Sequence, residues 1–121
     1  MEPKTTLVLG ASDNAARYSY LAIQRLLENN HPVKAIGKKK TKALGINIET
    51  DEIKWNDIDT ITLYLNPNNQ KQYYDYILSL SPKRIIFNPG AENPELAKLA
   101  AARGIKTLEA CTLVMLSTGQ F

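Results

Sequence analysis

Near its N-terminus the chain reads Leu7-Val8-Leu9-Gly10-Ala11-Ser12-Asp13-Asn14. The apolar part is typical of a strand buried on both faces of a parallel sheet, and it ends at a glycine and small polar residues. Apolar residues then recur at helical spacing over residues 18–29. Backbone N–H groups in such a turn, and in the first turn of a helix, carry partial positive charge and bind anions without a side chain. The stretch therefore predicts a strand, a phosphate-binding turn and a helix.

The remainder of the 121-residue chain repeats this alternation. Strands are predicted for residues 5–9, 33–36, 59–65, 84–87 and 105–108, with a further short strand over 46–48. Helices are predicted for residues 18–29, 69–80, 94–103 and 111–117. Alternating strands and helices are typical of a doubly wound parallel sheet of the α/β class, with right-handed crossovers. We expect one Rossmann-like domain over residues 1–121, with five to six strands in the order 3-2-1-4-5-6.

The charge of the chain is mild and local. The formal net charge is +3, and five lysines gather in one segment, whereas Trp55, Tyr73, Tyr74 and Tyr76 lack interleaved basic residues. This pattern does not indicate a nucleic-acid partner. The clustered lysines are Lys34, Lys38, Lys39, Lys40 and Lys42.

The sequence also indicates a compartment. No apolar stretch approaches the ~20 residues of a membrane span, and no signal-peptide pattern precedes the first strand. The lone Cys111 fits a reducing environment. We therefore expect a cytoplasmic protein without a membrane partner, and the sequence leaves open whether it is a monomer or a homodimer.

Four loops are expected at the carboxyl edge of the sheet, where ligands of this fold class bind. They cover residues 10–17, 37–42, 66–69 and 88–93, and the third of them begins at Asn66. A small nucleotide is the expected ligand.

The first loop lacks the full G-x-G-x-x-G pattern, because Ser12 and Ala15 stand where the second and third glycines would be. Small residues from Gly10 to Asn14 still permit a close backbone approach. Ser12 offers its hydroxyl and N–H to a phosphate, and Arg17 adds a charge-assisted bond. The alternative is that these are ordinary turn residues.

The second loop carries Gly37-Lys38-Lys39-Lys40, where an NAD site usually has an acidic residue for the ribose. Lysines there favour an extra phosphate on the ribose, as in NADP or in the 3′-phosphorylated ADP of coenzyme A. The alternative is a solvated lysine loop.

The last of the four loops begins Asn88-Pro89-Gly90 and offers an amide and a glycine to a pyrophosphate or a pantetheine amide. The alternative is an ordinary turn, since Pro-Gly is a common turn pair.

The sequence shows no convincing catalytic group and no metal-ligand spacing. His31 precedes Pro32 at the edge of the sheet opposite the expected ligand, where a surface turn is the better interpretation. Cys111 is expected to be a buried residue at a helix start. The pattern favours a binding protein over an enzyme.

An ordered set of motifs resembles the CoA-binding family of small Rossmann-like proteins, similar to the nucleotide-binding domain of the succinyl-CoA synthetase alpha subunit. The motifs are Val8-Leu9-Gly10-Ala11-Ser12, Asp59-Thr60-Ile61, the turn from Asn88 to Glu95, Gly104-Ile105 and Cys111-Thr112. They extend over nearly the whole chain.

This resemblance implies that Gly10, Ala11 and Ser12 hold the pyrophosphate, and that the later loops flank the adenine and the pantetheine. The chain has Ile36-Gly37-Lys38 where many members carry Val-Asn-Pro.

The leading hypothesis is a non-catalytic binder of coenzyme A or an acyl-CoA. An NADP-binding domain of a redox enzyme or sensor is the main alternative. A third hypothesis is a mixed disulfide between Cys111 and CoA.

Overall fold

The computed structural model describes residues 2–121 and contains one sheet in which seven strands follow the order β3-β4-β2-β1-β5-β6-β7. Adjacent strands run parallel, except for β3, which is antiparallel to β4. The strands are β1 Thr6–Ala11, β2 Val33–Gly37, β3 Thr41–Ala43, β4 Ile46–Glu49, β5 Thr60–Leu63, β6 Arg84–Phe87 and β7 Lys106–Glu109. The predicted α/β class is confirmed.

The predicted strand order is confirmed for the parallel part, since β4-β2-β1-β5-β6-β7 is the order 3-2-1-4-5-6. The predicted count of five to six strands was wrong, because β3 adds an antiparallel edge. Leu44 and Gly45, with φ of 54° and 80°, form the turn that joins β3 to β4. Positive φ at both turn residues suits a tight hairpin. The short polar sequence of β3 has no apolar pattern, so only Gly45 signals this hairpin.

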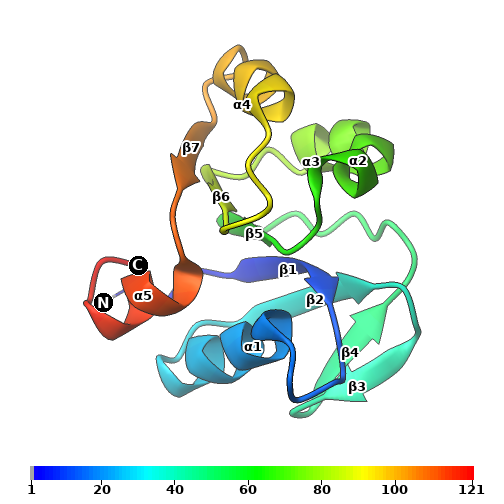
Figure 1. The fold of residues 1–121 in the computed structure, drawn as a ribbon, viewed down its shortest axis with the longest axis vertical. Helices are drawn as coiled ribbons and strands as arrows, with labels where there is room; N and C mark the ends of the chain where they lie inside the picture. The colour runs from blue at the N-terminus through cyan, green and yellow to red at the C-terminus, as the bar shows by residue number, and fades with distance from the viewer. Residues whose placement is uncertain (1) are drawn as a thin grey trace.

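Helices cover both faces of the sheet, with α1 and α5 on one face and α2, α3 and α4 on the other (Figure 1). The helices are α1 Tyr18–Glu28, α2 Pro67–Gln70, α3 Tyr74–Ser79, α4 Pro94–Ala101 and α5 Thr112–Ser117, and the 3₁₀ helix η1 spans Lys71–Tyr73. None of the helices within residues 2–121 is both long enough and apolar enough to cross a membrane.

The helix predicted for residues 69–80 is divided into α2, η1 and α3. It also begins earlier, because the Asn66 side chain accepts a hydrogen bond from the N–H of Asn69 and Pro67 occupies the first helical position. The single continuous helix was therefore a wrong prediction.

The two faces of β1 build the two halves of the core. Leu7 and Leu9 are fully buried in the cluster under α3 and α4, whereas Val8 belongs to the cluster under α1 and α5. Side chains alternate across a strand, so an apolar residue at every position requires helices on both sides.

Two glycines let β1 lie close to both of its neighbours at the carboxyl edge. A Cβ on Gly37 would lie 2.3 Å from the backbone oxygen of Ala11, and a Cβ on Gly10 would lie 2.8 Å from that of Tyr64. Gly10 also has a φ of +98°. The sheet itself therefore requires glycine at both positions.

His31 is buried, with 1% of its surface exposed, so the prediction of a surface turn was wrong. Its Nδ1 accepts a hydrogen bond of 2.9 Å from the N–H of Lys4, and its ring centroid lies 4.8 Å from that of Phe121. The covering ring comes from the far end of the chain, so no local pattern reveals it. Burial, helped by the nearby Lys4 and Arg84, lowers the pKa of His31.

We predict that Gly37→Ala lowers the free energy of unfolding by about 2–3 kcal/mol, because the added methyl group meets rigid backbone rather than a movable side chain. The measurement is urea denaturation. The control is Gly45→Ala, where the methyl group meets nothing within 4 Å and only the positive φ costs about 1 kcal/mol. Equal losses in the two variants would contradict the proposed close approach.

We also predict that His31 makes the protein less stable in acid. A pKa below its ordinary value in the folded chain means that its contribution is fully present above pH ~6.5 and is lost as the pH falls through the folded value. Denaturation curves between pH 7 and pH 5 should fall more steeply for the wild type than for His31→Asn, whose carbonyl keeps a neutral acceptor. Parallel pH dependences in the two proteins would refute this role.

Candidate functional site

A cleft of about 550 Å³ opens at the carboxyl ends of β1, β2 and β5. The chain runs from β1 to β2 on one side and returns to β5 on the other side of β1, so the cleft lies at the point where the strand order reverses. Three segments line it. They are the loop from β1 to α1, the segment from Gly37 to Thr41, and residues Tyr64 to Tyr73.

The first wall contains Gly10, Ala11, Ser12 and Arg17 of the predicted site residues. The Ser12 hydroxyl accepts a hydrogen bond of 3.0 Å from the N–H of Asn14, which fixes the turn. The wall continues into Tyr18 and Ser19, the first residues of α1, and Arg17 precedes α1 without a side-chain capping bond. The N-terminal end of α1 therefore borders the cleft, with the polarity that favours an anion.

Asn14 does not line the cleft. Its side-chain oxygen accepts a hydrogen bond of 2.9 Å from the N–H of Ala16, and its backbone oxygen accepts one from Arg17. Asn14 thus shapes the loop from within.

The second wall contains Gly37, Lys38, Lys39 and Thr41. Lys39 Nζ lies 3.2 Å from Oδ2 of Asp13 on the first wall, and Thr41 Oγ1 donates a hydrogen bond of 3.0 Å to the same oxygen. Lys39 and Thr41 hold the pKa of the Asp13 carboxyl below its usual range. The two walls are therefore linked across the cleft by charge.

The third wall is formed by the segment that follows β5. Asn66 lies in it as predicted, and Asn69 ends the loop expected at this edge, although it was not predicted as a site residue. The wall also contains Tyr64, Leu65, Gln72 and Tyr73, which were not predicted. The sequence placed the first two in a strand and the last two on a helix, where packing is the simplest role. Burial raises the pKa of Tyr64 to about 12, so this phenol is a neutral, packed part of the wall.

A family model for the CoA binding domain matches residues 4–117. The chain belongs to the CoA-binding domain family. A solved structure described only as an uncharacterized protein is 48% identical over 100% of both chains, with a TM-score of 0.98. Among curated proteins, none matches the chain.

Two more distant structures share the fold of this CoA-binding domain. A hypothetical protein from Pyrococcus horikoshii OT3 is 22% identical over 96% of this chain and 83% of that one, with a TM-score of 0.85. A protein from Thermus thermophilus is 21% identical over 98% of this chain and 91% of that one, also with a TM-score of 0.85. The predicted family resemblance is confirmed by the family model.

The turn Asn88-Pro89-Gly90 of this CoA-binding domain lies outside the lining of the cleft. Asn88 is buried, and its amide donates hydrogen bonds to Thr62 Oγ1 at 2.7 Å and to the Leu63 oxygen at 2.9 Å. Its own oxygen accepts from the N–H of Thr112 at 2.9 Å. The amide expected to face a ligand therefore ties β5, β6 and the start of α5 together.

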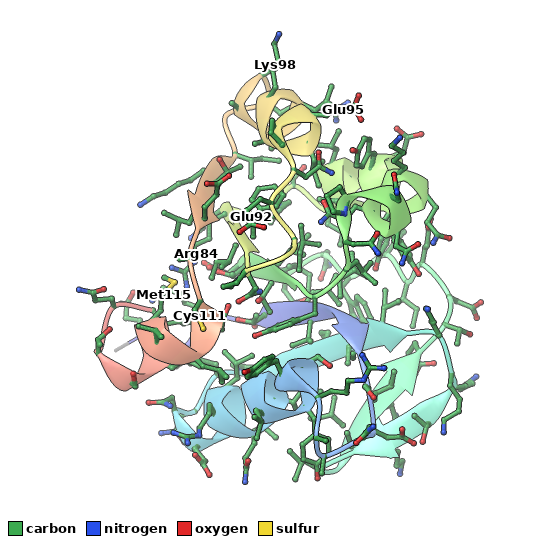
Figure 2. The ribbon with its side chains drawn as sticks, viewed as in Figure 1. Arg84, Glu92, Glu95, Lys98, Cys111 and Met115 are labelled. Atoms are coloured by element: carbon green, nitrogen blue, oxygen red, sulfur yellow. The ribbon has the colours of Figure 1, made fainter. Side chains whose placement is uncertain are left out.

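Cys111 lies where α5 begins and is partly exposed rather than buried (Figure 2). It does not line the cleft of the CoA-binding domain. Over residues 2–121, no group of three or more His, Cys, Asp or Glu side chains is placed to hold a metal ion.

A buried amide network supports the third wall from behind. Gln70 has no exposed surface, and its Nε2 donates to the backbone oxygens of Leu65 at 2.8 Å and Ala91 at 2.7 Å. Its Oε1 accepts from Asn93 Nδ2 at 2.9 Å. Gln70 therefore joins the wall after β5 to the loop before α4.

At the surface, the hydroxyl of Tyr74 extends this link by donating a hydrogen bond of 2.9 Å to Glu95, on the side of α4 that faces α3 (Figure 2).

We predict that Gln70→Glu destabilises the CoA-binding domain by about 2–3 kcal/mol at pH 7, because the buried carboxylate oxygen that replaces Nε2 would face the backbone oxygens of Leu65 and Ala91. The matched control is Gln72→Glu, in the same segment but exposed, which should change stability by less than about 0.5 kcal/mol. Thermal or urea unfolding measures both. A loss in Gln72→Glu as large as that in Gln70→Glu would contradict the network's role.

Proposed function

We propose that this protein binds coenzyme A or an acyl-CoA in the cleft and performs no reaction on it. The observation that carries the proposal is the cleft itself. The chain belongs to the CoA-binding domain family, and its cleft lies at the point where the strand order reverses. The turn from Gly10 to Ser12, which suits a phosphate, and the lysines Lys38 and Lys39 line this same cleft.

The diphosphate is assigned to the first wall. Gly10, Ala11 and Ser12 present backbone at the end of β1, and the N-terminal end of α1 adds its partial positive charge. Arg17 supplies a full charge at the same place, so the wall combines the two features that favour a diphosphate.

The phosphate on the ribose is assigned to Lys38 and Lys39 of the second wall. In this fold class the end of β2 lies beside the adenosine ribose. Ammonium groups there favour a phosphorylated ribose over a free one, which agrees with CoA.

The pantetheine arm is assigned to the third wall, where Asn66 and Asn69 offer amides and Leu65 and Tyr73 offer apolar surface. The exposed Pro89 and Gly90 lie at the same edge of the sheet. We assign Pro89 and Gly90 to the end of the pantetheine arm. Asn88 contributes only by holding the turn that contains these two residues.

The residues that border the cleft support binding without catalysis. Its lining holds neither a histidine nor a cysteine, and His31 is buried at the opposite edge of β2. The lining therefore offers no Ser–His or Cys–His pair of the kind that activates a nucleophile for covalent acyl transfer. An acyl-CoA incubated with the protein should keep its mass.

We predict that calorimetric titration detects CoA binding, and that Lys38→Gln/Lys39→Gln weakens it by about tenfold, since losing one charge-assisted bond costs about 1.4 kcal/mol or more. Dephospho-CoA, which lacks the phosphate on the ribose, should lose less than about threefold. The control Lys40→Gln/Lys42→Gln removes the same charge from residues outside the cleft and should leave both affinities nearly unchanged.

Absence of binding to CoA and to acyl-CoA at millimolar concentration would refute the proposal. Binding of NADP in place of CoA, with the same dependence on Lys38 and Lys39, would instead support a redox domain or sensor.

A further inference from the structure

The carboxylate of Asp13 is out of place in a cleft for a diphosphate. It follows Ser12 directly and lines the cleft, where it adds a negative charge beside the proposed phosphate site. Its Oδ2 contacts Lys39 Nζ at 3.2 Å and Thr41 Oγ1 at 3.0 Å. The lysine assigned to the ribose phosphate is thus paired with an anion that belongs to the protein.

The neighbouring lysine forms a similar pair outside the cleft. Lys40 also has an acidic partner, with its Nζ 3.9 Å from Oε1 of Glu49, but neither of these two residues lines the cleft. The chain therefore carries one lysine–carboxylate pair inside the candidate site and a comparable pair beside it.

The Asp13–Lys39 pair is suited to exchange. The side chains are 34% and 71% exposed, and exposed ion pairs are weak. A phosphate monoester carries nearly two negative charges and three acceptor oxygens, so it is the stronger partner for an ammonium group. Asp13 retains Thr41 as a donor when Lys39 leaves.

We propose that Asp13 competes with the ribose phosphate of the ligand for Lys39, and so sets how strongly the cleft discriminates a nucleotide with this phosphate from one without it. The inference rests on the proposed function. A ligand with the phosphate takes Lys39 and must break the pair, whereas a ligand without it leaves the pair intact. The carboxylate therefore lowers the affinity for the phosphorylated ligand more than that for the ligand without this phosphate.

The test is Asp13→Asn, which keeps an oxygen to accept from Thr41 and removes the charge that holds Lys39. Calorimetric titration should show CoA binding about threefold to tenfold more tightly, with dephospho-CoA changed by less than about twofold. The control Glu49→Gln removes the same charge from the Lys40 pair and should change neither affinity. In a Lys39→Gln background, Asp13→Asn should no longer affect CoA.

Four outcomes overturn the inference. Weaker CoA binding by Asp13→Asn would make Asp13 a ligand contact or a positioning residue for Lys39. An equal gain in affinity for CoA and for dephospho-CoA would mean that Asp13 acts through general electrostatic repulsion and not through Lys39. An unchanged CoA affinity would exclude competition and leave the proposed function in place. Failure of the wild-type chain to bind CoA would remove both.

Discussion

The close approach of β1 to its two neighbours at the carboxyl edge is the constraint on which the rest of the structure depends. Gly37 lies against the backbone of Ala11, and Gly10 lies against that of Tyr64. Neither contact leaves room for a side chain, so the backbones at the ends of β1, β2 and β5 lie close together. The segments that follow these three strands therefore leave the sheet from almost the same place. The cleft exists because these segments diverge from there, one toward α1, one toward β3 and one toward α2. Packing between backbones thus fixes where a ligand is able to bind.

The sequence predicted those parts of the fold whose cause is local. The continuous apolar runs of β1 and β6 require burial on both faces, and turn residues follow within two positions of each run. The hairpin strand β3, the division of the helix after Pro67 and the burial of His31 have causes elsewhere. They depend on a partner strand, on the inward turn of Gln70 and on the ring of Phe121. For Gln70 and His31 no window of neighbouring residues contains that information, because their partners include Ala91 and Phe121. The partner of β3 is the adjacent β4, but only Gly45 signals their hairpin.

The candidate site divides in the same way. Turns at strand ends carry glycine and lysine signals, which is why most residues of the first two walls were predicted. Asp13, Tyr18, Ser19 and Thr41 also line these walls but were not predicted as site residues. The third wall was found only as far as Asn66, since its tyrosines and amides are equally suited to packing. Asn88 is the opposite case, because it is a polar residue at the ligand-binding edge of the sheet whose amide hydrogen-bonds within the protein. A buried amide satisfies its hydrogen bonds before it serves any ligand.

The strands at the two borders of the sheet have a consequence for how copies of this chain meet. β3 has three residues and carries Lys42, and β7 has four residues with Lys106 and Glu109 at its ends. Short, charged border strands discourage the addition of a further strand from another molecule. Extension of the sheet into a continuous ribbon between molecules is therefore disfavoured, and this protects a protein whose central strands are almost wholly buried from aggregation through its strands.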